Sequence, residues 1–120
     1  MATLIDPDFR ARLRALNEKY AAGVPALIQA IGDAQQRCDV EGPREEQLTA
    51  LHRALHAVAG SAATFGFAAL GQECRRIEQL VRQLLNEPGS VQAEWPPLSA
   101  QVGDLLRWAA MDPAATHFVA

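Results

Sequence analysis

The chain has 120 residues, of which 49% are hydrophobic and 21% charged, which suits a single domain, residues 1–120, with one buried core. Its formal net charge is −3 and Lys19 is its only lysine, so we expect no nucleic-acid partner. The amino terminus lacks a signal-peptide pattern, and no apolar run approaches the ~20 residues of a membrane span. We therefore expect a soluble, cytoplasmic protein without a membrane partner.

The periodicity of the chain is helical from its beginning. Alternation of apolar and polar residues, as in strands, is nearly absent, so we predict an all-α fold. The first helix should start near Asp6, which precedes a proline. Apolar residues then follow one side of it: Phe9, Leu13, Leu16 and Tyr20. After Gly23 and Pro25 the apolar pattern resumes and continues to about Cys38, which leaves open one kinked helix or two separate helices.

A connection and a central helix come next. Residues 39–43 contain the glycine and proline of a loop, and the two glutamates after Arg44 suit the positive end of a helix. The apolar residues of this helix step by three and four: Leu48, Leu51, Leu55, Val58, Ala62 and Phe65. This spacing predicts a buried stripe, and we expect Gly66 to end the helix.

Two further helices follow the same pattern. After Gly66 the apolar positions again step by four and three: Leu70, Cys74, Ile77, Val81 and Leu84. A turn this short makes the two helices antiparallel. Residues 86–90 interrupt the chain, Trp95–Pro97 leads into a last helix, and Asp112–Pro113 ends it. We predict an antiparallel four-helix bundle, with an extra short N-terminal helix if the first segment is divided.

Two patterns bear on disulfide or metal chemistry. Cys38 and Cys74 are too few for a disulfide framework or a cysteine-rich zinc site, so we expect two reduced thiols. His52 and His56 have the spacing of two metal ligands on one helix, but no further aligned ligand is evident. We expect no metal site, and we interpret His52 as a solvated neighbour that tunes the charge near His56.

The predicted hairpin places residues of its two helices opposite each other. If the turn pivots near Phe67, residues at equal height have numbers that add up to roughly 134, because both helices rise at the same rate. His56 then faces Glu78, and each follows an apolar residue of its own stripe. If the carboxylate accepts from Nδ1 of the imidazole, the Nε2 lone pair points to solvent. Such a histidine is a poised nucleophile.

The residues around this pair resemble a known signature, that of histidine phosphotransfer (HPt) domains, the helical phosphocarriers of bacterial two-component phosphorelays. The matching positions are His56, Gly60, Ser61, Ala62, Gly66, Leu70, Cys74, Ile77 and Glu78. The resemblance is strongest from Leu51 to Leu85 and is compatible with nearly the whole chain. It implies that His56 accepts a phosphoryl group from a receiver-domain aspartyl phosphate and passes it to another receiver, and that Glu78 orients the imidazole.

The resemblance also implies the partners and the chemistry that they supply. Receiver domains of response regulators are the expected partners, with a hybrid sensor histidine kinase, and the receiver would contribute Mg²⁺ and a lysine. In this chain we find neither a glycine-rich phosphate loop with its lysine nor an acidic cluster for a metal, so we expect no cofactor and no ATP site. The expected activity is that of a phosphoryl carrier, not of an enzyme.

Small residues near His56 predict the surface on which a receiver docks. Ala59, Ala63 and Thr64 should form a shallow, mostly apolar surface. We interpret Gly60 as a residue in the middle of the helix, where glycine costs about 1 kcal/mol, so that close approach of the receiver explains it best.

One departure from the family concerns charge. Many HPt domains carry a lysine three residues after the phosphoacceptor, where this chain has Ala59. Arg53, one turn before His56, and Arg75, opposite Ala59, could replace that cation, and we hypothesise that Arg75 does so in part. The missing lysine leaves an alternative open, a degenerate helical module that binds and sequesters a receiver or kinase without accepting phosphate.

The apolar stripes can all be covered within one bundle, so a monomer is expected. Leu4 and Ile5 could add a contact. We expect an independent carrier, because no kinase segment follows, as it would in a chemotaxis-type kinase.

Overall fold

The computed structural model describes residues 6–120, and its regular structure is helical throughout. Four α-helices form the fold: α1 (Pro7–Glu41), α2 (Glu45–Ala59), α3 (Ala68–Asn86) and α4 (Val91–Met111). Two short 3₁₀ turns lie between them: η1 (Ala62–Phe65) and η2 (Pro88–Ser90). Within residues 6–120 there is no strand, so the prediction of an all-α fold is confirmed.

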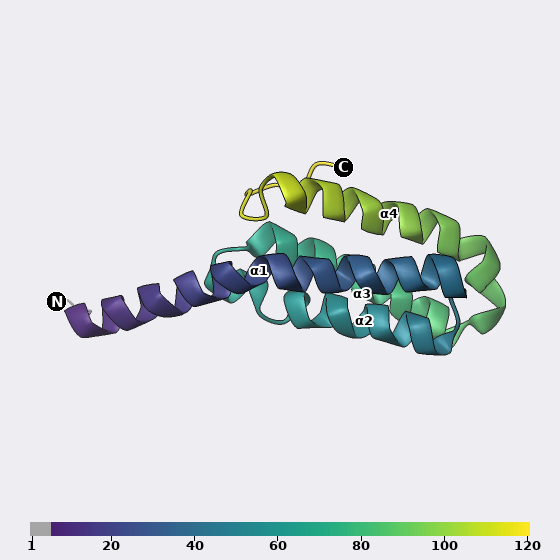
Figure 1. Cartoon of the computed structure of the whole chain (residues 1–120), viewed down its shortest axis with the longest axis horizontal. Coiled ribbons are helices and arrows are strands. Elements are labelled where there is room, and N and C mark those ends of the chain that lie inside the picture. The colour runs from purple at the N-terminus through teal and green to yellow at the C-terminus, as the bar shows by residue number, and fades with distance from the viewer. Residues whose placement is uncertain (1–5) are drawn as a thin grey trace.

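The helices form a four-helix bundle, in which each packs against two neighbours. α2 lies between α1 and α3, and α4 lies against α1 and α3 (Figure 1). The predicted stripes supply the core: the largest side chains with almost no exposure include Leu48, Leu51, Leu55, Leu70, Ile77 and Leu105. Cys38 and Cys74 are buried free thiols, as expected, and burial raises their pKa values to about 11 and about 12.

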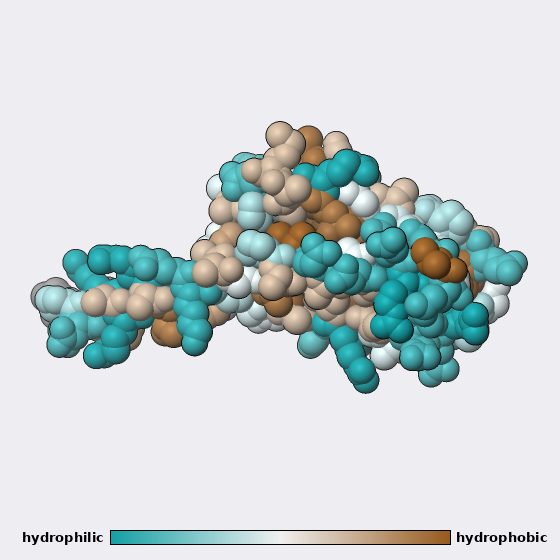
Figure 2. Space-filling view, viewed as in Figure 1, coloured by the Kyte–Doolittle hydropathy of each residue, from teal (hydrophilic) through white to brown (hydrophobic). Residues whose placement is uncertain are grey.

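The first helix resolves the alternative that the sequence leaves open. α1 is one continuous helix of 35 residues with Pro25 inside it, so the extra short N-terminal helix is wrong. Its first turns project beyond the other helices, with their apolar and hydrophilic side chains both in contact with solvent (Figures 1 and 2). Phe9, Leu13 and Leu16 are each about half exposed, so this part of the predicted stripe does not join the core. Leu4 and Ile5 lie outside the described residues.

The central helix ends earlier than predicted. α2 stops at Ala59, and the chain continues through η1 to Gly66, whose φ of 92° is left-handed and suits glycine. The 3₁₀ turn η1 packs closely on the first turn of α3: a Cβ placed on Gly71 would lie 3.3 Å from the Cβ of Ala62. α3 therefore begins close against η1, which sets the height of its residues relative to α2.

The last helix begins a turn earlier than predicted. α4 starts at Val91, so Pro96 and Pro97 lie inside it and do not precede it. Trp95 is buried, and its Nε1 donates to Asp39 of α1 over 2.9 Å, which ties this stretch to the bundle. None of the helices in residues 6–120 has the length and apolar character of a membrane span.

Candidate functional site

The candidate site lies on the hairpin of α2 and α3. Three pairs of residues meet across it, and in each pair the residue numbers add up to 134, as the hairpin predicts. They are His56 with Glu78, Ala59 with Arg75, and His52 with Arg82. The pivot at Phe67 is therefore confirmed, and with it the prediction that His56 faces Glu78.

His56 is bound on one side of its ring and open on the other. Its Nδ1 lies 2.6 Å from Oε2 of Glu78, a short hydrogen bond in which the ring N–H donates to the carboxylate. The imidazole is 67% exposed, whereas the Glu78 side chain is only 7% exposed. A proton held at Nδ1 leaves the lone pair on Nε2, so this nitrogen is available to a reagent from solvent.

Glu78 also lies near two other polar groups. The same oxygen is 3.3 Å from Nε2 of His52 and 3.9 Å from a guanidinium nitrogen of Arg82. The His52 side chain is only 19% exposed, so its interpretation as a solvated neighbour is wrong. Burial lowers the pKa of His52; Glu78 opposes this shift, whereas Arg82 and His56 add to it. The height rule that identified Glu78 also pairs His52 with Arg82, and this signal was available in the sequence.

Two of the predicted access residues need correction. Ala59 is buried, 6% exposed, because it joins the core side of α2, so it is not part of a docking surface. Gly60 does not lie in the middle of a helix: it caps the end of α2 with a right-handed φ of −81°. This conformation does not require glycine. Gly60, Ala63 and Thr64 are all exposed, as predicted.

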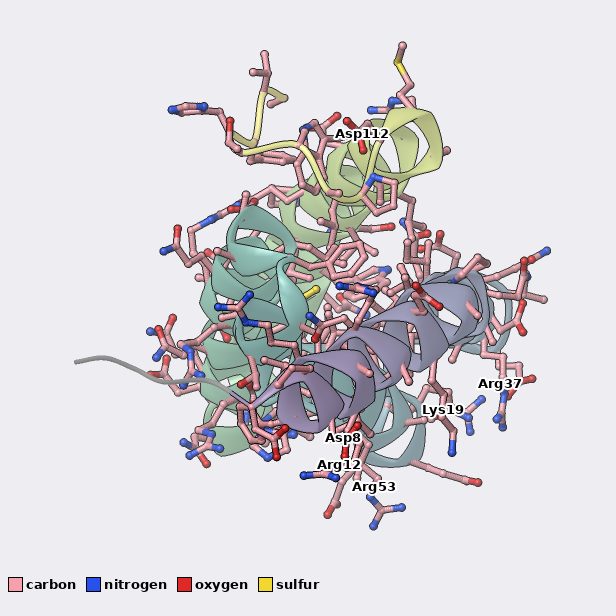
Figure 3. The ribbon with its side chains drawn as sticks, turned by 90° about the vertical axis from the view of Figure 1, so that its left-hand side faces the viewer. Asp8, Arg12, Lys19, Arg37, Arg53 and Asp112 are labelled. Carbon is pink, nitrogen blue, oxygen red and sulfur yellow. The ribbon has the colours of Figure 1, made fainter. Side chains whose placement is uncertain are left out.

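The two arginines predicted as possible charge support lie in different places. Arg75 donates from a guanidinium nitrogen to the carbonyl of Ala59 over 3.1 Å, so it binds the end of α2 one turn beyond His56. Arg53 lines a hollow with Arg37 of α1 and Glu46, and its side chain points away from the bundle (Figure 3). Of these two arginines, only Arg75 therefore lies where α2 and α3 face each other.

A contact from α1 holds the turn beside the site. The hydroxyl of Tyr20 and that of Ser61 are 2.8 Å apart, and Ser61 also donates to the carbonyl of Ala57. The Tyr20 ring stacks on Phe65 with 4.6 Å between ring centroids. Tyr20 is thus the packing residue that the sequence predicts, with a polar role that only the contact reveals. It anchors the segment that follows His56.

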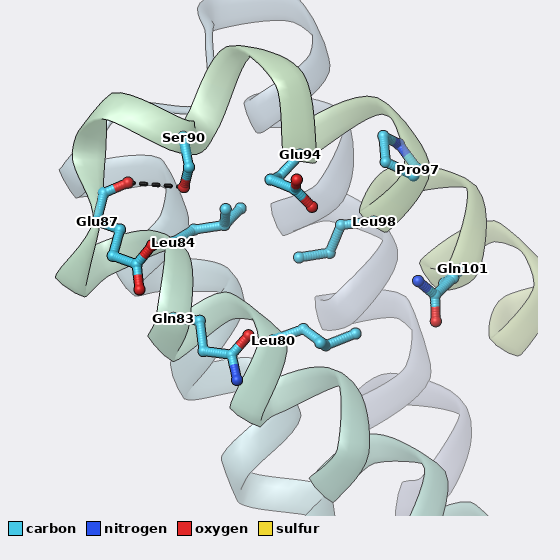
Figure 4. A pocket seen from close by; sticks show the side chains of 9 residues that line it. All are labelled: Leu80, Gln83, Leu84, Glu87, Ser90, Glu94, Pro97, Leu98 and Gln101. Carbon is cyan, nitrogen blue, oxygen red and sulfur yellow. Dashed lines mark hydrogen bonds between the residues drawn. The ribbon is translucent and has the colours of Figure 1, made fainter.

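Other hollows lie away from His56 and Glu78. One of about 330 Å³ lies between α3 and α4, where Leu80, Leu84 and Leu98 meet Glu87 and Glu94 (Figure 4). Residues 6–120 contain no group of three or more His, Cys, Asp or Glu side chains arranged to hold a metal ion.

Comparison with known proteins identifies the class of the chain. The sequence model of the Hpt domain matches residues 11–110, and the chain belongs to this family. Its members are phosphocarrier modules that act in histidine phosphotransfer and interact with the receivers of response regulators. Neither curated proteins nor solved structures include a significant match to this sequence.

Proposed function

We propose that His56 is the phosphoacceptor of a phosphorelay intermediate, which takes a phosphoryl group from the aspartyl phosphate of one receiver and passes it to another. The observation that carries this proposal is the state of His56: 67% exposed, with Nδ1 bound over 2.6 Å to a carboxylate that is itself buried. Exposure makes Nε2 reachable, and the bound Nδ1 holds the proton on the nitrogen that does not react.

The transfer step uses the lone pair on Nε2. This lone pair attacks the phosphorus, a P–N bond forms, and the bond between phosphorus and the aspartyl oxygen breaks, so that its electron pair returns to the carboxylate of the receiver. The imidazole becomes positively charged as the P–N bond forms. Glu78 stabilises this charge through the Nδ1–H bond without taking the proton, and delivery to the next receiver reverses the step.

The remaining chemistry belongs to the partners in this proposal. The receiver supplies Mg²⁺ and a lysine that neutralise the charge on the moving phosphoryl group, so this chain needs no cofactor of its own. The exposed Gly60, Ala63 and Thr64 leave room for a receiver close to His56. The partners proposed are receivers and a hybrid sensor kinase, and the protein acts as one domain and a monomer.

Arg75 is the proposed substitute for the missing family lysine. It is an exposed cation that binds the carbonyl of Ala59, the residue at the position of that lysine. A guanidinium there adds positive charge one turn beyond His56.

The experiment is phosphorylation by phosphoramidate or by a phosphorylated receiver, followed by intact mass and by mapping of the acid-labile, base-stable adduct. We expect one phosphoryl group at His56 and none in His56→Gln. If a folded protein takes up none from any active receiver, the carrier proposal is wrong. A degenerate module that binds a receiver without chemistry would then be tested by binding assays.

A further inference from the structure

One hydrogen bond, from His56, is not the only polar contact of the buried Glu78 carboxylate. It is only 7% exposed, and a buried carboxylate needs polar partners to offset its lost hydration. Its Oε2 atom has His56 Nδ1 at 2.6 Å and His52 Nε2 at 3.3 Å, while Arg82 is more distant at 3.9 Å and is itself 61% exposed. His52 is therefore the nearest polar neighbour after His56, and it is mostly buried.

We propose that His52 is a positioning residue for His56, and that it acts through Glu78 by electrostatic attraction between its Nε2–H and the shared carboxylate oxygen, 3.3 Å from Nε2. The inference rests on the proposed function, since it concerns the geometry of the proposed acceptor. It assigns a role to a residue that the hairpin places one turn below His56 on the same helix.

The surroundings of His52 favour one tautomer. Its lowered pKa keeps the ring neutral near pH 7, so only one of its nitrogens carries a proton. If that proton were on Nδ1, the Nε2 lone pair would face a carboxylate oxygen 3.3 Å away. In that tautomer Nε2 would accept the hydrogen bond from the Arg82 guanidinium, which is long at 3.5 Å, whereas the carboxylate oxygen lies nearer. A proton on Nε2 turns the closer contact into an attraction.

The two imidazoles are also held parallel. Their ring centroids are 6.0 Å apart with 10° between the ring planes, because residues four apart lie above one another on a helix. His52 therefore approaches Glu78 from below while His56 approaches it at its own height. Attraction from both imidazoles leaves the carboxylate less freedom to rotate away from Nδ1 of His56. The tautomer of His56 that has its proton on Nδ1 and none on Nε2 is therefore favoured.

The test compares His52→Phe, which keeps a ring without a donor, with His52→Gln, whose amide nitrogen replaces Nε2–H. The first measurement is ¹⁵N NMR of the unphosphorylated protein at pH 7.5, which reports the tautomers of His52 and His56. The second is the initial rate of phosphorylation by phosphoramidate. His117→Phe, a change in the C-terminal tail, is the matched control.

We expect wild-type His52 to carry its proton on Nε2. In His52→Phe the Nδ1–H population of His56 should fall, and the rate should fall by roughly three- to tenfold, the effect of one modest polar contact. His52→Gln should restore both to within about twofold, and His117→Phe should change neither. A role in packing alone would not change the His56 tautomer while the helical signal stays intact.

The inference is overturned if His52 is protonated on Nδ1, if the His56 tautomer is the same in His52→Phe, or if folded His52→Gln behaves like His52→Phe. The NMR arm does not depend on phosphate uptake. A wild-type protein that shows the expected tautomers but accepts no phosphoryl group would contradict the proposed function and leave the positioning of His56 established.

Discussion

The two turns of α2 that carry His52 and His56 present the same side chain to the same carboxylate, with opposite results. His56 uses Nδ1 and is 67% exposed, whereas His52 approaches with Nε2 and is 19% exposed. The cause is height. His56 is level with Glu78, so its near nitrogen meets the carboxylate and its far nitrogen points outward. His52 lies one turn lower and reaches Glu78 with its far nitrogen, which is then no longer free.

A histidine on this hairpin offers to solvent the nitrogen that the carboxylate leaves free, and in the proposed function this is the nitrogen that accepts phosphate. Exposure alone does not decide which nitrogen of a ring is available, since a neutral imidazole can expose either nitrogen. In the proposed function, the position of Glu78 on α3 decides which ring acts as the nucleophile and which supports it. Four experiments test this division, with expected effects that range from complete loss of phosphate uptake to a modest change in stability.

Replacing the level histidine should remove the function completely. His56→Gln should take up no phosphoryl group, because His52, the other imidazole of the site, is only 19% exposed. Intact mass after treatment with phosphoramidate or a phosphorylated receiver measures this. His117→Gln, in the C-terminal tail, should behave like wild type. An adduct that persists in His56→Gln and maps to His52 would reverse the roles assigned to the two residues.

Removing the shared carboxylate should slow transfer without abolishing it. In Glu78→Ala we expect the rate to fall by roughly 10- to 100-fold, since a hydrogen bond to a charged group contributes about 1.5–3 kcal/mol. The rate of Glu78→Gln should fall less, because the amide oxygen of glutamine can still accept a hydrogen bond from Nδ1. Initial rates from a phosphorylated receiver measure both. Equal rates for wild type and Glu78→Ala would show that His56 needs no orientation from α3.

Removing Arg75, which binds the end of α2 one turn beyond His56, should have a smaller effect. Arg75→Ala should lower the phosphorylation rate by about two- to fivefold, the effect of one partly exposed charge. The lifetime of the phosphohistidine should change in the same assay. Arg53→Ala, at an arginine that points away from the hairpin, is the control. The hypothesis that Arg75 replaces the family lysine fails if neither the rate nor the lifetime changes.

The smallest effect should appear in the pH dependence of stability. The pKa of folded His52 is lowered below its ordinary value of 6.5, mainly by burial, so the unfolded chain binds a proton at this residue more readily. The free energy of unfolding should therefore decrease as the pH falls below 6.5 towards the folded-state pKa. Urea denaturation between about pH 5 and 8 measures it. His52→Phe should show a shallower slope, and an unchanged slope would contradict the shift.

Much of the site could be predicted because it depends on local regularities. Apolar residues at steps of three and four define the buried sides of α2 and α3, and the short turn makes the helices antiparallel. From these two facts the pairing of His56 with Glu78 follows by counting. The same count places Arg75 opposite Ala59, where the structure has their hydrogen bond.

The errors arise where burial depends on elements that are distant in sequence. Phe9 and Leu13 have the spacing of core residues, yet no other helix reaches them, so they remain half exposed. Alanine is small enough to lie on a surface or in a core. Ala59 lies in the core, 6% exposed, because neighbouring elements cover it. The position of Pro96 suggested a helix start, but the bond of Trp95 to Asp39 holds an earlier turn in helical form.

The helical class, the α2–α3 hairpin and the level at which an imidazole meets a carboxylate can be read from local patterns of residues, because helix period and turn length act over a few residues. Two features need the folded arrangement: α1 is a single helix that projects beyond the bundle, and His52 is mostly buried beside Glu78. Both depend on which surfaces remain covered when four helices pack. That coverage is a property of the whole arrangement, which no local pattern of residues contains.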